Sequence, residues 1–131
     1  MKSEKRRYVG IDLGKRTYTV VVIGKTGKVS LSNGRTDGGG RAALYGKLEK
    51  GDKVAREAGN LAFIMAKEII EQVGCEVVVL NAGKLALIYG SMKKTDKEDA
   101  LKLARIVEQF REEQLPVVPL PSEREMRRRK L

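Results

Sequence analysis

The first part of the chain has the hydrophobic pattern of β-strands. Apolar residues alternate with small and polar ones from Tyr8 to Leu13, which is the two-residue period of a strand. Residues 17–23 end in an uninterrupted apolar run, which is typical of a strand buried on both faces. A Gly-Lys-Thr-Gly turn at residues 24–27 then leads to a third strand near residues 28–32. The pattern therefore predicts three consecutive antiparallel strands.

Helical and strand patterns alternate along the rest of the chain. The three glycines at residues 38–40 are expected to break the pattern before the next helix. The expected elements are, in order, a short helix over residues 41–50, a strand over 53–58, a helix from 60 to about 73, a strand over 75–80, a short helix over 84–89 and a long helix from about 96 to 113. This order predicts an α/β fold of ribonuclease H-like (RuvC-like) type, with a mixed five-stranded sheet and flanking helices.

Length and composition limit the class of protein. A chain of 131 residues suits one domain, and a hydrophobic content of 41% excludes a wholly disordered chain. No apolar run approaches about 18 residues, and no signal-peptide cleavage site follows the basic start. We therefore expect no membrane span and no secretion signal.

The chain has one cysteine and no histidine. An internal disulfide, a Ser-His triad and the usual zinc sites are therefore excluded. Cys75 begins an apolar run, so we expect it to be a small buried side chain in a reducing compartment. Any metal ion in this protein must be held by oxygen atoms.

The net charge of +10 is concentrated at the two ends of the chain. Residues 1–7 and 122–131 together carry six of the ten net positive charges. Clustered positive charge suits a polyphosphate partner, because binding to phosphates releases counterions. Two solvated tails would have the same composition, and charge alone leaves both interpretations open.

The start of the last helix combines two patterns. Thr95 and Glu98 have the spacing of a capping box, which would explain Glu98. Asp96 and Asp99 each lie four residues before an apolar position of the helix, which places both carboxylates on the stripe that faces the sheet. Carboxylates that face the protein interior cost folding free energy unless a positively charged group lies beside them.

Two further acids lie where predicted strands end: Asp12 closes the first strand and Glu57 closes the fourth. Because these strands are neighbours in the expected fold, four acids could meet at one edge of the sheet. Taken singly, each acid has an ordinary structural explanation. Taken together, the four carboxylates favour a site for Mg²⁺ or Mn²⁺, and a pair of such ions can stabilise both the attacking and the leaving oxygen of a phosphodiester.

Three segments resemble a known signature in order and spacing. They are YVGIDLGK at residues 8–15, REAG at residues 56–59 and KTDKEDA at residues 94–100. The pattern is similar to that of the DEDD transposases of insertion sequences, the RuvC-like, bridge-RNA-guided recombinases related to the recombinase Piv. The resemblance runs from about Tyr8 to Pro121. It implies that Asp12, Glu57, Asp96 and Asp99 are the catalytic metal ligands, with two bound ions.

The same resemblance implies a domain organisation. Residues 1–7 would form a basic arm, residues 8–121 the DEDD domain, and residues 122–131 a basic tail that starts a helical connection. Family members typically continue into a second domain that carries a nucleophilic serine, so we expect an enzyme that is incomplete without that domain.

Basic residues near the acids are candidates for nucleic-acid binding. These candidates are Lys15, Arg16, Lys93, Lys94, Arg127, Arg128 and Arg129. The leading interpretation is a metal-dependent nuclease/recombinase domain of a transposase in the prokaryotic cytoplasm, with DNA, a guide RNA and a second copy of the chain as the partners to consider. Two alternatives remain open: a stand-alone resolvase of RuvC or YqgF type, and a non-catalytic nucleic-acid-binding fragment.

Overall fold

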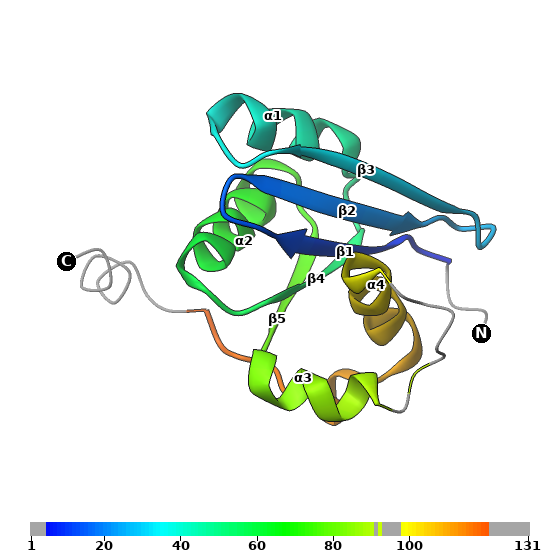
Figure 1. Cartoon of the computed structure of the whole chain (residues 1–131). Helices are drawn as coiled ribbons and strands as arrows, with labels where there is room; N and C mark the ends of the chain where they lie inside the picture. Colours follow the sequence, from blue (N-terminus) through cyan, green and yellow to red (C-terminus); the bar gives the residue numbers. More distant parts are fainter. Residues whose placement is uncertain (1–4, 91, 93–97, 121–131) are drawn as a thin grey trace.

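Five strands form one mixed sheet in the order β3-β2-β1-β4-β5 (Figure 1). The structure is a computed structural model that describes residues 5–90, 92 and 98–120. The strands are β1 (Tyr8–Leu13), β2 (Thr17–Ile23), β3 (Val29–Arg35), β4 (Lys53–Glu57) and β5 (Glu76–Leu80). The first three are antiparallel neighbours, whereas β4 and β5 run parallel to β1. This confirms the predicted α/β class and its ribonuclease H-like order of elements.

The edge strand β3 is longer than its sequence pattern predicts. It continues to Arg35, because all seven residues of β2 find a partner in it, from Ile23 with Val29 to Thr17 with Arg35. Its segment after Leu31 is polar, and its residues alternate between half-buried and exposed. A strand without a buried face carries no hydrophobic alternation, so the pattern could not reveal this extension.

Two layers of helices cover the sheet. Helices α1 (Gly38–Lys47) and α2 (Asn60–Gln72) pack on one face, while α4 (Asp99–Gln109) packs on the other and the shorter α3 (Ala82–Tyr89) joins its core (Figure 1). The first core includes Val9, Ile11, Val54, Leu44, Met65 and Ile69. The second includes Ala55, Val78, Leu80, Leu85, Leu103 and Ile106. Both faces of β1 and β4 are therefore buried.

Helix α1 starts inside the three glycines, where a break was expected. Asp37 caps it, because one of its carboxylate oxygens accepts a hydrogen bond from the Gly40 N–H at 2.8 Å. Gly40 is required there, since a Cβ atom would lie 1.8 Å from the Arg35 carbonyl oxygen. The prediction of a helix start at residue 41 was wrong. The Asp37 cap and the close approach of Gly40 to the Arg35 carbonyl outweigh the low helix propensity of glycine.

Helix α4 is shorter than predicted at its C-terminal end. Phe110 is extended, and residues Glu112–Gln114 form a separate 3₁₀ turn. This change of direction lets Leu115 enter the core beneath α4 and lets Val117 bridge to Leu80 of β5. Tertiary contacts of the following segment therefore end the helix.

Gly10 lets α4 approach β1 closely. A Cβ atom at this position would lie 1.8 Å from the Ala100 carbonyl oxygen and 2.6 Å from the Ala104 backbone nitrogen. Because a glycine faces α4 here, the helix backbone rests directly on the strand. This contact fixes the first turn of α4 against β1.

Two further expectations concern the core and the membrane. Cys75 is buried and free, and burial raises the pKa of its thiol to about 11, which confirms a small buried side chain. Among the described residues, no helix is long and apolar enough to cross a membrane.

Candidate metal centre

Asp12 and Glu57 lie at the same edge of the sheet and on the same face. The parallel register pairs Ile11 of β1 with Arg56 of β4, so Asp12 and Glu57 are the next positions along both strands. Gly10 faces α4, and side chains alternate along a strand, so Asp12 two residues later is also on the α4 face. The same alternation from Ala55, which lies in the α4 core, places Glu57 there.

The electrostatics of these two acids show that negative charge is crowded at this edge. Burial is the first cause that raises the pKa of Asp12, followed by the charges of Asp99 and Glu98. Burial likewise raises the pKa of Glu57, followed by the charges of Asp12 and Asp99. A carboxylate whose neighbours are carboxylates is destabilised in its charged form. The edge therefore favours binding of a positive charge.

The start of α4 supplies the third acid. Asp99 is the first residue of the helix and Glu98 is its N-cap residue. The expected capping box is therefore wrong, because Glu98 precedes the helix and its side chain makes no cap hydrogen bond. Asp96 lies outside the described residues, so its place in the site stays a prediction.

The donor set fits a hard divalent cation. The three acids that interact are all oxygen donors, and Mg²⁺ and Mn²⁺ prefer oxygen ligands. Within the described parts of the chain, however, no three Asp, Glu, Cys or His side chains form a group that could hold a metal ion. The described acids thus form an electrostatically coupled set rather than a closed coordination shell.

Two residues beside the acids were missed by the sequence interpretation. Burial raises the pKa of the Tyr89 phenol, and the charges of Glu57, Asp99 and Asp12 raise it further. Its hydroxyl oxygen is buried and has no hydrogen-bond partner among the described residues. Because the phenol stays neutral, it can donate a hydrogen bond into this negative environment.

Lys102 is the second missed residue. Its Nζ lies 3.7 Å from an oxygen of Asp99 and 5.2 Å from the centre of the Tyr89 ring. The spacing of three residues between Asp99 and Lys102 could have indicated this ion pair on a helix. No local pattern could have indicated Tyr89, because it comes from α3 through the tertiary fold.

A hollow of about 250 Å³ opens beside Asp12 and Glu57. The remainder of its wall includes Gly14, Gly59 and the first turn of α2. Gly59 provides no side-chain cap for α2, so this turn presents uncapped backbone N–H groups. The hollow gives a ligand access to the two acids from the solvent.

The predicted nucleic-acid-binding residues fall into two groups. Lys15 and Arg16 are exposed and follow directly after β1, at the same end of the sheet as Asp12. The others lie outside the described residues: Lys93, Lys94, Arg127, Arg128 and Arg129.

Comparison with known proteins identifies the family of this chain. Residues 9–129 match the model of the IS110-type DEDD family, described as transposase. The chain belongs to this family. No curated protein matches the chain. Membership in this transposase family confirms the resemblance seen in the three sequence segments, and the matched range contains all four acids.

Membership in the transposase family carries three general properties. A transposase domain has an enzymatic role in DNA transposition, it binds DNA, and DEDD transposases depend on divalent metal ions. The assignment of particular residues to these tasks goes beyond the family and is taken up below.

Replacing Asp12 by Asn should stabilise the transposase domain in EDTA at neutral pH, with a melting temperature raised by about 2–4 °C. A raised pKa means that the native state binds its proton more tightly than the unfolded state. Asp12 therefore contributes stability at low pH that is lost as the pH rises through the native pKa. The advantage of Asn should shrink toward pH 4, and the Mg²⁺-induced rise in melting temperature should weaken.

Glu71→Gln is the matched control, because it removes one negative charge from an exposed position of α2. It should leave the melting temperature and the Mg²⁺ response close to those of the unmodified chain. An Asp12→Asn variant that melts lower in EDTA and keeps the full Mg²⁺ response would remove Asp12 from the site.

Proposed function

We propose that this chain is the metal-dependent nuclease/recombinase domain of an insertion-sequence transposase. The observation that carries the proposal is the crowding of Asp12, Glu57 and Asp99 at one edge of the sheet. Burial raises the pKa of Asp12 and of Glu57, and the charge of Asp99 raises both further. Natural proteins retain such repulsion where a cation relieves it. The family model covers the same residues and supports DNA as the substrate.

In this proposal Asp12, Glu57, Asp96 and Asp99 are the catalytic residues that hold two Mg²⁺ or Mn²⁺ ions. The bound ions supply Lewis-acid stabilisation of the attacking and leaving oxygens during phosphodiester cleavage and transfer. The rigid strands β1 and β4 hold Asp12 and Glu57, while the contact of α4 with Gly10 keeps Asp99 near them. Tyr89 adds a buried neutral phenol beside the acids, and Lys102 supports Asp99 through its ion pair.

We propose that the basic residues bind the DNA substrate. Lys15 and Arg16 lie at the acid end of the sheet, where they can contact phosphates of the DNA that is cut. We propose the same role for Lys93, Lys94, Arg127, Arg128 and Arg129. A guide RNA and a second copy of the chain are further proposed partners, and we propose the prokaryotic cytoplasm as the place of action.

A crystal soaked in Mn²⁺ tests the metal site directly. We expect anomalous difference density between Asp12, Glu57 and Asp99, and its loss in a crystal of the Glu57→Gln variant. Glu71→Gln should retain the density, because this residue lies on α2 and not among the acids. A soaked crystal with no density at these acids would overturn the proposed metal centre.

The isolated chain should bind Mn²⁺ and DNA yet nick supercoiled plasmid poorly. The acids can bind metal ions and orient a phosphate, but they supply no covalent nucleophile, which we assign to a serine on a second domain. The measurement is conversion of supercoiled plasmid to the open circular form in Mn²⁺. Rapid nicking that disappears in Glu57→Gln would favour a stand-alone resolvase of RuvC or YqgF type instead.

A further inference from the structure

A second charged feature lies at the opposite end of β1 and β4 from the acids. A hollow of about 390 Å³ is bordered there by three segments that are distant in sequence. Lys5 comes from the residues before β1, Lys25 from the turn between β2 and β3, and Lys50 from the loop between α1 and β4. The tertiary fold therefore brings three lysines to one hollow.

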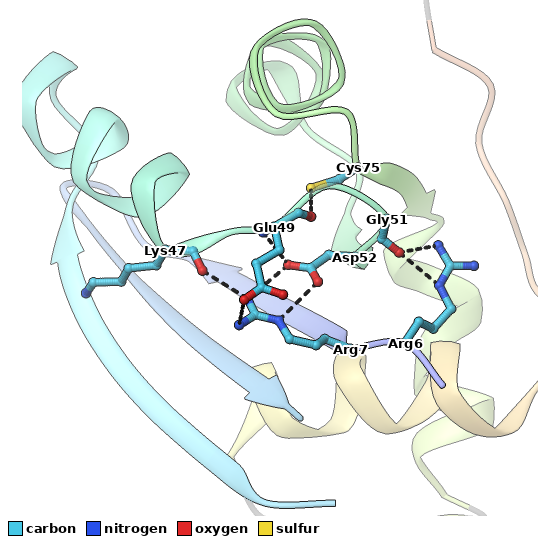
Figure 2. Close-up of polar contacts among 7 residues, drawn as sticks. All are labelled: Arg6, Arg7, Lys47, Glu49, Gly51, Asp52 and Cys75. Carbon is cyan, nitrogen blue, oxygen red and sulfur yellow. Dashed lines mark hydrogen bonds and ion pairs between the residues drawn. The ribbon is translucent and has the colours of Figure 1, made fainter. Parts of the chain in front are cut away.

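Two arginines build a rigid wall of this hollow, and neither is free for a ligand (Figure 2). Arg7 donates to both carboxylate oxygens of the buried Asp52, at 3.0 and 2.9 Å, and to the Lys47 carbonyl oxygen at 2.9 Å. Arg6 donates twice to the Gly51 carbonyl oxygen, at 3.1 and 2.8 Å, and forms an ion pair with Glu76 at 3.1 Å. The end of the basic arm is thus part of the folded framework.

Both acids of this lining are paired with Arg7. Asp52 is 2% exposed and also accepts a hydrogen bond from the Glu49 N–H at 2.8 Å. The Glu49 carboxylate lies 3.4 Å from Arg7. Among the described residues, neither acid forms an ion pair with a lysine of the hollow. The lining carries five basic and two acidic side chains, so its net charge is +3.

The loop that carries Lys50 is held in place at one side of the hollow. The stem of Lys50 lies along Gly74, since a Cβ on that glycine would be 3.4 Å from Lys50 Cγ. The hydrogen bonds of Arg6 and Arg7 hold the loop that carries Lys50 against the start of the sheet. A loop that is already held loses less conformational entropy on binding than a freely moving one would.

We propose that this hollow, bordered by Lys5, Lys25 and Lys50, is a second binding site for a phosphodiester backbone, separate from the acid edge. The net positive charge of this lining, with three exposed ammonium groups, matches the charge of a nucleic-acid strand and recognises no base sequence. Asp12 lies five positions after Arg7 along β1, a distance of roughly 17 Å. This is about twice the screening length at physiological salt, so the two sites act independently.

The test compares two double variants of equal charge in the full chain, with EDTA present so that the acid site holds no metal ion. Lys25→Gln/Lys50→Gln alters the hollow, and Lys47→Gln/Lys84→Gln alters two exposed lysines outside it. The measurement is the slope of log K against log salt for a duplex DNA and for a single-stranded RNA. Removing two phosphate contacts should flatten the slope by up to about 1.8 for the duplex or about 1.4 for the single strand.

The nucleic acid whose salt slope flattens more, duplex DNA or single-stranded RNA, is the one that occupies the hollow. A flatter slope with either one supports a phosphodiester site. Equal changes in the two double variants would overturn the proposal and leave a solvated patch. Melting temperatures close to that of the unmodified chain exclude unfolding as a cause. The Mg²⁺ response of the same variants should be unchanged, so failure of this site and failure of the metal centre are told apart.

Discussion

Replacing Gly10 by Ala should reduce the free energy of unfolding by about 4 kcal/mol or more, a large share of the roughly 5–15 kcal/mol typical of a domain. The new methyl group would lie 1.8 Å from the Ala100 carbonyl oxygen and 2.6 Å from the Ala104 nitrogen. Both atoms belong to the backbone of α4, so no side-chain rotation can relieve the clash. The helix must move away from β1, and urea unfolding measures the loss.

Gly46→Ala is the matched control for this prediction. Gly46 lies in α1, and a Cβ atom there would meet no atom within 4 Å. Alanine should therefore stabilise the domain by about 0.5–1 kcal/mol through its higher helix propensity. A Gly10→Ala variant as stable as the unmodified chain would show that α4 does not rest on β1 at this point.

Replacing Arg56 by Met should raise the free energy of unfolding by about 1–4 kcal/mol. Arg56 is fully buried, and its Nε and Nη1 have no hydrogen-bond partner among the described residues. Its Nη2 has only the weak acceptor Met65 Sδ, at 3.7 Å. Burial lowers the pKa of Arg56 to about 10, so the group is still charged at neutral pH and its desolvation is uncompensated.

Arg41→Met should instead lower the free energy of unfolding. Arg41 donates to Glu68 at 3.1 Å and to the Thr36 carbonyl oxygen at 2.8 Å, so its removal breaks a part-buried ion pair and takes a donor from the Thr36 carbonyl. A loss of about 1 kcal/mol or more is expected. Thermal unfolding of the two variants side by side checks both signs, and a destabilised Arg56→Met would show that the guanidinium has a stabilising partner.

Local sequence patterns were sufficient for the order of strands and helices. Strand periodicity located β1, and the apolar run before Gly24 located the buried end of β2. Sequence also indicated where α2 ends, because Gly74 follows its C-cap residue Val73 and has a φ of +85°. These features depend on neighbours in sequence and on burial of one face.

Patterns failed where long-range packing decides the structure. The polar half of β3 is a strand because β2 supplies its partners, and α4 ends at Gln109 because the following segment turns toward β5. Arg56 reads as a charged residue that should be exposed, yet the layer of α2 buries it. In each case the contacts that stabilise the observed structure come from residues far away along the chain.

The sequence by itself determined the fold class, the family signature and the two acids that close β1 and β4, because strand ends and motif spacing are local properties. Only the tertiary structure decided that Tyr89 lies beside those acids, with Lys102 over its ring, and that the lysine hollow exists. Their positions follow from the crossing of α4 over β1 and from the anchoring of Arg7 on Asp52. Such contacts depend on side-chain shape and burial across the sheet, which no periodicity along the chain encodes.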